Sequence, residues 1–196
     1  MGNCRTPAEM AARWHDAGIP DGYTISQLLY NPASESVVIE VHGMKGAVLP
    51  ERLLIRRMRE HRYELVGNPE EDVSFRSPAT CEKHPILVFN SMRWRKYPPA
   101  RYRGADWDGL YLFDFHTRDL TLLASPKDLN IPAPYDERGW IAGVLSLSDD
   151  ARYAYVKVGL GKREDERTVK YDYHVARFDL KGKDLQLISH LKNIWF

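Results

Sequence analysis

This sequence of 196 residues contains few cysteines, no long apolar run and no excess of one charge. Its 28 Lys and Arg residues balance 27 Asp and Glu residues, so the net charge of +1 gives no reason to expect nucleic acid as a partner. Cys4 and Cys81 lie far apart and neither belongs to a CxxC pair, which excludes a disulfide framework and favours a cytoplasmic location. The longest apolar runs, such as residues 86–89, are too short to form a transmembrane segment, and no signal peptide is expected.

The motifs of common enzyme classes are also missing. The sequence has no G-x-S-x-G elbow, no H-E-x-x-H helix, no Walker loop and no Rossmann glycine cluster. Its seven histidines are scattered without metal-ligand spacing. Asp172 and His174 face the same side of a predicted strand, but no nucleophile accompanies them. We therefore expect no catalytic residue, no metal and no cofactor.

Residues 1–22 are predicted to form an N-terminal helix and cap. Residues 6–9, Thr-Pro-Ala-Glu, match a capping box with proline at the first helical position, and Gly18 is expected to end the helix. The first six residues also match the pattern M-G-x-x-x-[ST], which is typical of acylation at Gly2 with a second chain on Cys4. The capping box explains the same threonine structurally, so both interpretations stay open.

From residue 23 onward, short β-rich runs alternate with turn residues. The runs group into three units of four strands, at about residues 23–67, 72–125 and 139–190, within a domain covering 23–196. Each unit has the pattern of an antiparallel β-meander. The predicted fold class is therefore all-β, with three meander units and a short N-terminal α-helix.

Two segments carry a resemblance to a known family. Residues 110–123, L-Y-L-F-D-F-H-T-R-D-L-T-L-L, and residues 147–156, L-S-D-D-A-R-Y-A-Y-V, resemble the blade motifs of TolB-like β-propellers. In the second motif Ala151 stands where the family usually has glycine. The resemblance covers all three units and implies architecture more than activity. It also implies that Asp114 and Asp179 bond to the backbone amides of the turns that follow them.

The number of units raises the question of closure, because closed propellers need at least four blades and this sequence supplies three. A homodimer that completes a six-bladed ring would cover the exposed sheet faces. A stack capped by the N-terminal helix, or a chain that is a fragment of something longer, would be alternatives.

Meander geometry places the connections between second and third strands on one face. These are the long connections, at about residues 42–52, 90–109 and 159–173, the last of which we interpret as a loop with a solvated tip. Long loops on a rigid scaffold commonly form binding surfaces, so this face is the predicted functional surface.

The second of these connections interleaves five cations with four aromatic side chains. Guanidinium groups bind carboxylate or phosphate, and aromatic faces stack on ligands. Alternatively, the aromatic side chains pack the loop down while the arginines stack on them and pair with Asp106 and Asp108. The predicted ligand-binding residues are Arg93, Trp94, Arg95, Tyr97, Arg101, Tyr102, Arg103 and Trp107.

These observations favour a non-catalytic interaction module that binds a protein, a peptide or an anionic ligand through the long-loop face or the blade edges. The alternative is a small propeller-type hydrolase or carbohydrate-active enzyme, whose site lies in a channel completed by dimerisation.

Overall fold

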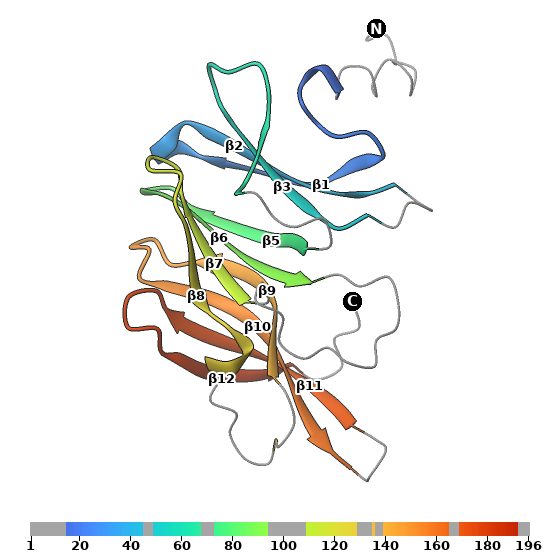
Figure 1. Cartoon of the computed structure of the whole chain (residues 1–196). Coiled ribbons are helices and arrows are strands. Elements are labelled where there is room, and N and C mark those ends of the chain that lie inside the picture. Colours follow the sequence, from blue (N-terminus) through green and yellow to red (C-terminus); the bar gives the residue numbers. More distant parts are fainter. Residues whose placement is uncertain are drawn as a thin grey trace, which may run out of the picture.

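A computed structural model of the chain confirms the predicted all-β class (Figure 1). Within the residues that the structure describes, twelve strands form three four-stranded antiparallel sheets, each ordered as a simple meander. No helix in the part of the chain described below is long and apolar enough to cross a membrane. The structure describes residues 15–44, 49–67, 73–93, 109–128, 135, 139–164 and 169–191.

The first sheet consists of β1 (Tyr23–Asn31), β2 (Ser36–Gly43), β3 (Arg52–Arg57) and the short β4 (Glu64–Leu65). The 3₁₀ turn η1 (Pro32–Ser34) joins β1 to β2. Neighbouring strands pair in the order β1-β2-β3-β4.

The second sheet repeats this plan with longer strands. It consists of β5 (Val73–Cys81), β6 (His84–Arg93), β7 (Gly109–Asp114) and β8 (Leu120–Ala124). The 3₁₀ turn η3 (Pro126–Asp128) follows β8.

The third sheet consists of β9 (Gly139–Leu147), β10 (Tyr153–Arg163), β11 (Val169–Asp179) and β12 (Leu185–Leu191). The prediction of a loop at residues 159–173 is wrong for most of this range, because β10 continues to Arg163 and β11 begins at Val169. Glycine weakens a strand pattern, so Gly159 looked like a loop residue from local sequence alone. In the sheet it pairs with Tyr173 on one side and Trp140 on the other, and these neighbours keep it extended.

The predicted turn chemistry is confirmed. Asp114 accepts hydrogen bonds from the amides of the next turn at 2.7 and 3.0 Å, and Asp179 does the same at 2.9 Å from two amides. These amide bonds lower the pKa of Asp179. Ala151 has a φ of 51°, the left-handed conformation that favours the glycine usual at this position.

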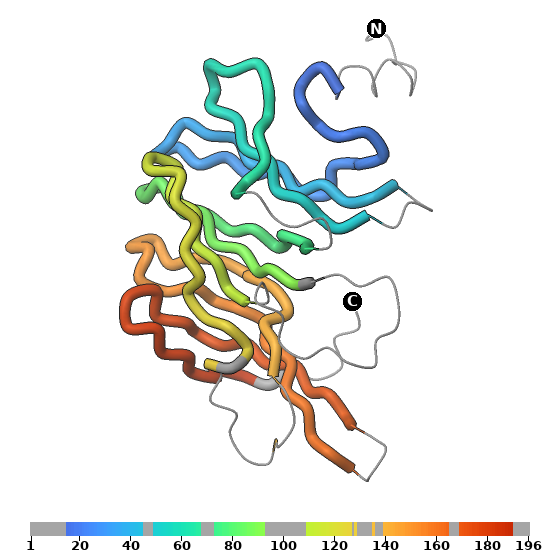
Figure 2. Tube along the Cα trace, viewed as in Figure 1, coloured from blue at the N-terminus to red at the C-terminus, as the bar shows by residue number. Residues whose placement is uncertain are grey.

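The three sheets stack in chain order (Figure 2). An aromatic core lies between the first and second sheets and includes Phe75, Phe89, Tyr111 and Phe113. The core between the second and third sheets uses smaller side chains. Its buried members are Ala79, Val88, Leu110, Leu123, Ala124, Ile141, Val144, Ala154, Val156, Val158, Ala176 and Phe178.

Buried polar side chains also link the first sheet to the second. The Asn31 amide nitrogen donates to the carbonyls of Cys81 and His84 at 2.9 and 2.8 Å, and its oxygen accepts from Ser34. The Glu40 carboxylate accepts from the backbone amide of Ser77 at 2.8 Å. Burial is the main reason that the pKa of Glu40 is raised above 4.5.

The outer face of the first sheet is partly covered by its own chain. Ile19 packs with Ile39 and Leu54 on this face, together with Tyr63. The amide of Tyr63 donates to the carbonyl of Ala17, which ties residues 15–22 to the segment between β3 and β4. Residues 1–14, which include most of the predicted helix and the acylation pattern, lie outside the described residues.

The ends of the strands that flank the connections between the second and third strands lie on one side of the stack, on the right in Figure 1, which we term the long-connection side. There β2 ends and β3 begins, as do β6 and β7, and β10 and β11. Short turns occupy the opposite side.

Candidate binding site

Of the eight predicted ligand-binding residues in the cation-rich connection, the structure describes only the backbone of Arg93. Arg93 ends β6 on the long-connection side. Trp94, Arg95, Tyr97, Arg101, Tyr102, Arg103 and Trp107 lie outside the described residues, so their role stays a prediction.

A two-stranded arm extends from the third sheet on the same side (Figure 1). β9 pairs with β10 only as far as Leu160, and β12 pairs with β11 only as far as Tyr173. Residues 161–163 and 169–171 pair with each other beyond these points. We refer to these two segments as the arm.

An aromatic group lies at the root of the arm, on the face of the third sheet that points away from the second. The Trp140 ring meets Tyr171 and Tyr173 edge-on, with centroids 5.0 and 5.8 Å apart. A side chain at Gly159 would overlap the Trp140 ring, so this glycine leaves the space that the indole occupies. Lys157 lies over the Tyr173 ring at 4.3 Å. Partial burial, and secondarily Arg76, lower the pKa of this lysine.

The arm itself carries several cations. Lys162 and Lys170 are directly opposite each other in the β10–β11 ladder, and like charges in that position destabilise a strand pair. Lys170 forms an exposed ion pair with Glu164 at 3.7 Å. Arg163 is exposed next to them. The arm and its root therefore combine aromatic surface with positive charge.

The other face of β11 holds a hydrogen-bonded cluster. The Tyr135 hydroxyl donates to Asp172 at 3.1 Å and lies 2.9 Å from His174 Nε2. Because the hydroxyl proton is given to Asp172, His174 Nε2 must be the donor in the second bond. Burial, followed by Asp172, raises the pKa of Tyr135, so the phenol stays protonated.

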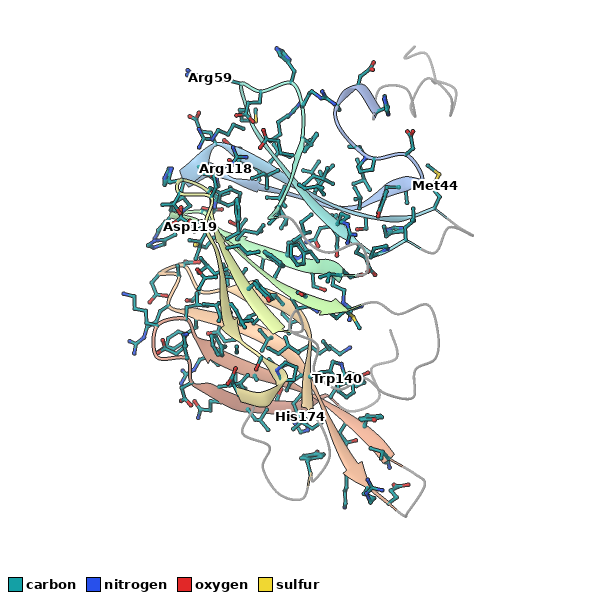
Figure 3. The ribbon with its side chains drawn as sticks, viewed as in Figure 1. Met44, Arg59, Arg118, Asp119, Trp140 and His174 are labelled. Carbon is teal, nitrogen blue, oxygen red and sulfur yellow. The ribbon has the colours of Figure 1, made fainter. Side chains whose placement is uncertain are left out.

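This cluster confirms that Asp172 and His174 share one face of a strand. Figure 3 labels His174 near Trp140 in the third sheet. Sequence reasoning missed Tyr135, because it lies between η3 and β9 and no local pattern links it to β11. The cluster holds Tyr135 against the sheet, and a protonated phenol supplies no nucleophile.

A second polar feature lies between the second and third sheets. Asn90 is fully buried, and its amide nitrogen reaches the carbonyl of Ile141 only at 3.5 Å. Its oxygen, and Nε of its strand partner Arg76, have no hydrogen-bond partner among the described residues.

The described residues give no evidence of a metal site or of a reactive thiol. No group of three or more His, Cys, Asp and Glu side chains there could hold a metal ion. Cys81 is buried at the end of β5 as a free thiol.

Comparisons with known proteins give little further information. No protein-family model matches the chain, and no curated protein matches it. Among solved structures, a chain from a study of two prolyl endopeptidases is similar at 11% identity, with a TM-score of 0.36. The alignment covers 95% of this chain and 39% of that one, so this chain spans about two fifths of its length. The propeller-like arrangement therefore rests on the three sheets themselves, and this similarity says nothing about activity.

Proposed function

We propose that the chain is a non-catalytic binding module of propeller type, which holds an acidic segment of a protein or peptide on the long-connection side. The observation that carries this proposal is the arm of the third sheet, where exposed cations lie beside a packed aromatic group. Arg163 shares the face of that group, whereas Lys162 and Lys170 lie on the other face of the strand pair. Aromatic and positively charged side chains at such a position are typical of protein-binding surfaces.

The aromatic group supplies a preorganised contact. Trp140 lies against Gly159 and two tyrosines, so it loses little conformational freedom on binding. Tyr171 is 50% exposed, which leaves part of this apolar surface open to a partner. Burial of that surface would provide affinity.

The cations supply the preference for acidic groups. Lys162 and Lys170 repel each other across the ladder, and an anionic partner between them would relieve this repulsion. Charges at the edge of a binding surface act mainly on association rate and selectivity, and their effect falls with salt.

The experiment is isothermal titration calorimetry at low salt, with an eight-residue glutamate peptide that carries one central leucine. Lys162→Gln combined with Lys170→Gln should weaken binding about three- to ten-fold, as expected for two exposed charges. The matched control is Lys181→Gln combined with Lys183→Gln, in the turn between β11 and β12 on the short-turn side. Equal loss in both variants, or equal binding of a lysine peptide, would contradict the proposal.

The cation-rich connection belongs to the same proposal, because β6 ends and β7 begins on the long-connection side. Replacing Arg93, Arg95, Arg101 and Arg103 together by alanine should further weaken binding of the glutamate peptide. Unchanged binding in a folded variant would remove this connection from the site.

A homodimer remains part of the proposal as a way to cover the outer faces of the stack. Leu28 and Tyr30 of β1 are 61% and 48% exposed on the outer face of the first sheet. A second copy whose third sheet packs there would bury them. The aromatic group at the root of the arm lies on this same outer face of the third sheet, so the assembly would cover it and leave the arm beyond Leu160 accessible.

A further inference from the structure

The segment between β3 and β4 forms a second positively charged surface, at the opposite end of the stack from the arm. Residues 56–63 have the sequence R-R-M-R-E-H-R-Y, with four arginines and one glutamate. Arg57, Arg59 and Arg62 are exposed, as is His61. Figure 3 shows Arg59 at the outer tip of this segment, which we term the basic hairpin.

An apolar side chain lies among these cations. Met58 is 54% exposed at the start of the turn, directly between Arg57 and Arg59. Its amide donates to the carbonyl of Glu35 at 2.9 Å, so the backbone that presents it is held in place. An exposed thioether flanked by arginines allows this surface to contact negative charges and an apolar layer at the same time.

Few of the neighbouring acids neutralise this charge. Glu60 accepts a hydrogen bond from the backbone amide of Arg57, which uses its carboxylate within the turn. Glu64 is paired with Arg118 of the turn between β7 and β8. The Arg56 guanidinium lies over the Tyr63 ring at 5.0 Å and packs at the base of the hairpin.

The N-terminal segment lies beside the basic hairpin. Besides the bond from Tyr63 to Ala17, the backbone of Gly18 packs so closely on the carbonyl of Tyr63 that a side chain there would clash. Residues 15–22 therefore pack against the base of the basic hairpin.

From the exposed arginines and the exposed Met58 between them, we propose that the basic hairpin is a docking site for an anionic lipid surface. Arg57, Arg59 and Arg62 bind lipid phosphate and carboxylate groups. Met58 enters the boundary between headgroups and acyl chains. The contact forms no covalent bond with the lipid, and each arginine near the surface contributes about five-fold to partitioning.

The experiment is co-sedimentation of the full chain with vesicles of phosphatidylcholine containing about 30% phosphatidylserine, a composition that gives a strong negative surface potential. Binding is expected there and not to vesicles of phosphatidylcholine alone. Arg59→Gln combined with Arg62→Gln should reduce the partition coefficient about ten-fold or more, and Met58→Glu should reduce it in a folded protein. Lys181→Gln combined with Lys183→Gln, in the turn between β11 and β12, is the matched control and should change it little.

Two results would overturn the proposal. One is unchanged vesicle binding by the variant lacking Arg59 and Arg62. The other is equally tight, equally arginine-dependent binding of inorganic polyphosphate or a short DNA duplex, which would identify a soluble polyanion as the ligand. The glutamate-peptide titration is independent of this site, so the two proposals can fail separately.

Discussion

Two buried asparagines offer a matched test of what holds the sheets together. Asn31 and Asn90 are both fully buried, and each lies where two sheets meet. Asn31 bonds to Thr80 and to the carbonyls of Cys81 and His84. Asn90 makes one long bond of 3.5 Å, and its oxygen has no partner among the described residues.

Replacing each asparagine by alanine removes the same atoms, so the cost of the cavity largely cancels between the variants. Asn31→Ala leaves two carbonyls without their amide donor and the Ser34 amide without its acceptor. An unsatisfied buried group costs about 1–3 kcal/mol, and several of these partners are only partly buried. We therefore expect Asn31→Ala to lower the free energy of unfolding by about 3–4 kcal/mol, and Asn90→Ala by about 1 kcal/mol or less.

The measurement is urea unfolding followed by circular dichroism, with all proteins at one concentration because assembly affects apparent stability. With a slope of about 2 kcal/mol/M, the difference between the two variants corresponds to a midpoint separation of about 1–1.5 M. Equal midpoints for the two variants would refute the reasoning, since they would show that the bonds of Asn31 add nothing beyond packing.

Four further predictions follow from single positions. The pKa of Glu40 is raised in the folded state, so the folded protein binds more protons than the unfolded protein just above pH 4.5. The free energy of unfolding should therefore fall as pH rises through that window, and Glu40→Gln should remove this fall. A stability difference between wild type and variant that does not change with pH would contradict this prediction. Gly159→Ala should displace Trp140, with changed near-ultraviolet circular dichroism and weaker glutamate-peptide binding; an unchanged spectrum would show that the ring does not lie on this glycine. Ala151→Gly should stabilise the protein by about 0.5–1 kcal/mol in urea unfolding, because its φ is positive, and destabilisation would argue against that conformation. Light scattering coupled to size exclusion should give twice the monomer mass, reduced to the monomer by Leu28→Asp, and a monomeric wild-type protein would exclude the ring dimer.

Much of the fold could be predicted from the sequence because its signals are local. Strand alternation gave the three four-stranded units, and the acids at the turns identified their hairpins. Asp114 and Asp179 bond to the turn amides as expected. Even the faint first unit was correct in its number of strands.

The errors and omissions arise where distant segments determine local structure. Gly159 is extended because Trp140 and Tyr173 flank it, and neither neighbour is evident from a short window of sequence. Tyr135 joins Asp172 and His174 from a connection with no regular pattern. The basic hairpin was not singled out from the sequence, because only the fold shows that it lies beside residues 15–22.

The contrast between the two sheet interfaces has a consequence for the order of folding. Hydrogen bonds of the buried Asn31 and the half-buried Glu40 join the first two sheets. The third sheet packs on small apolar side chains, and Asn90 Oδ1 and Arg76 Nε at that interface have no hydrogen-bond partner among the described residues. During synthesis from the N-terminus, residues 23–124 would emerge with both partners of the polar interface already present. We expect these two sheets to form first as one cooperative unit. The third sheet, which carries the arm, would then dock last and detach first, so its amides would exchange hydrogen fastest in the native protein.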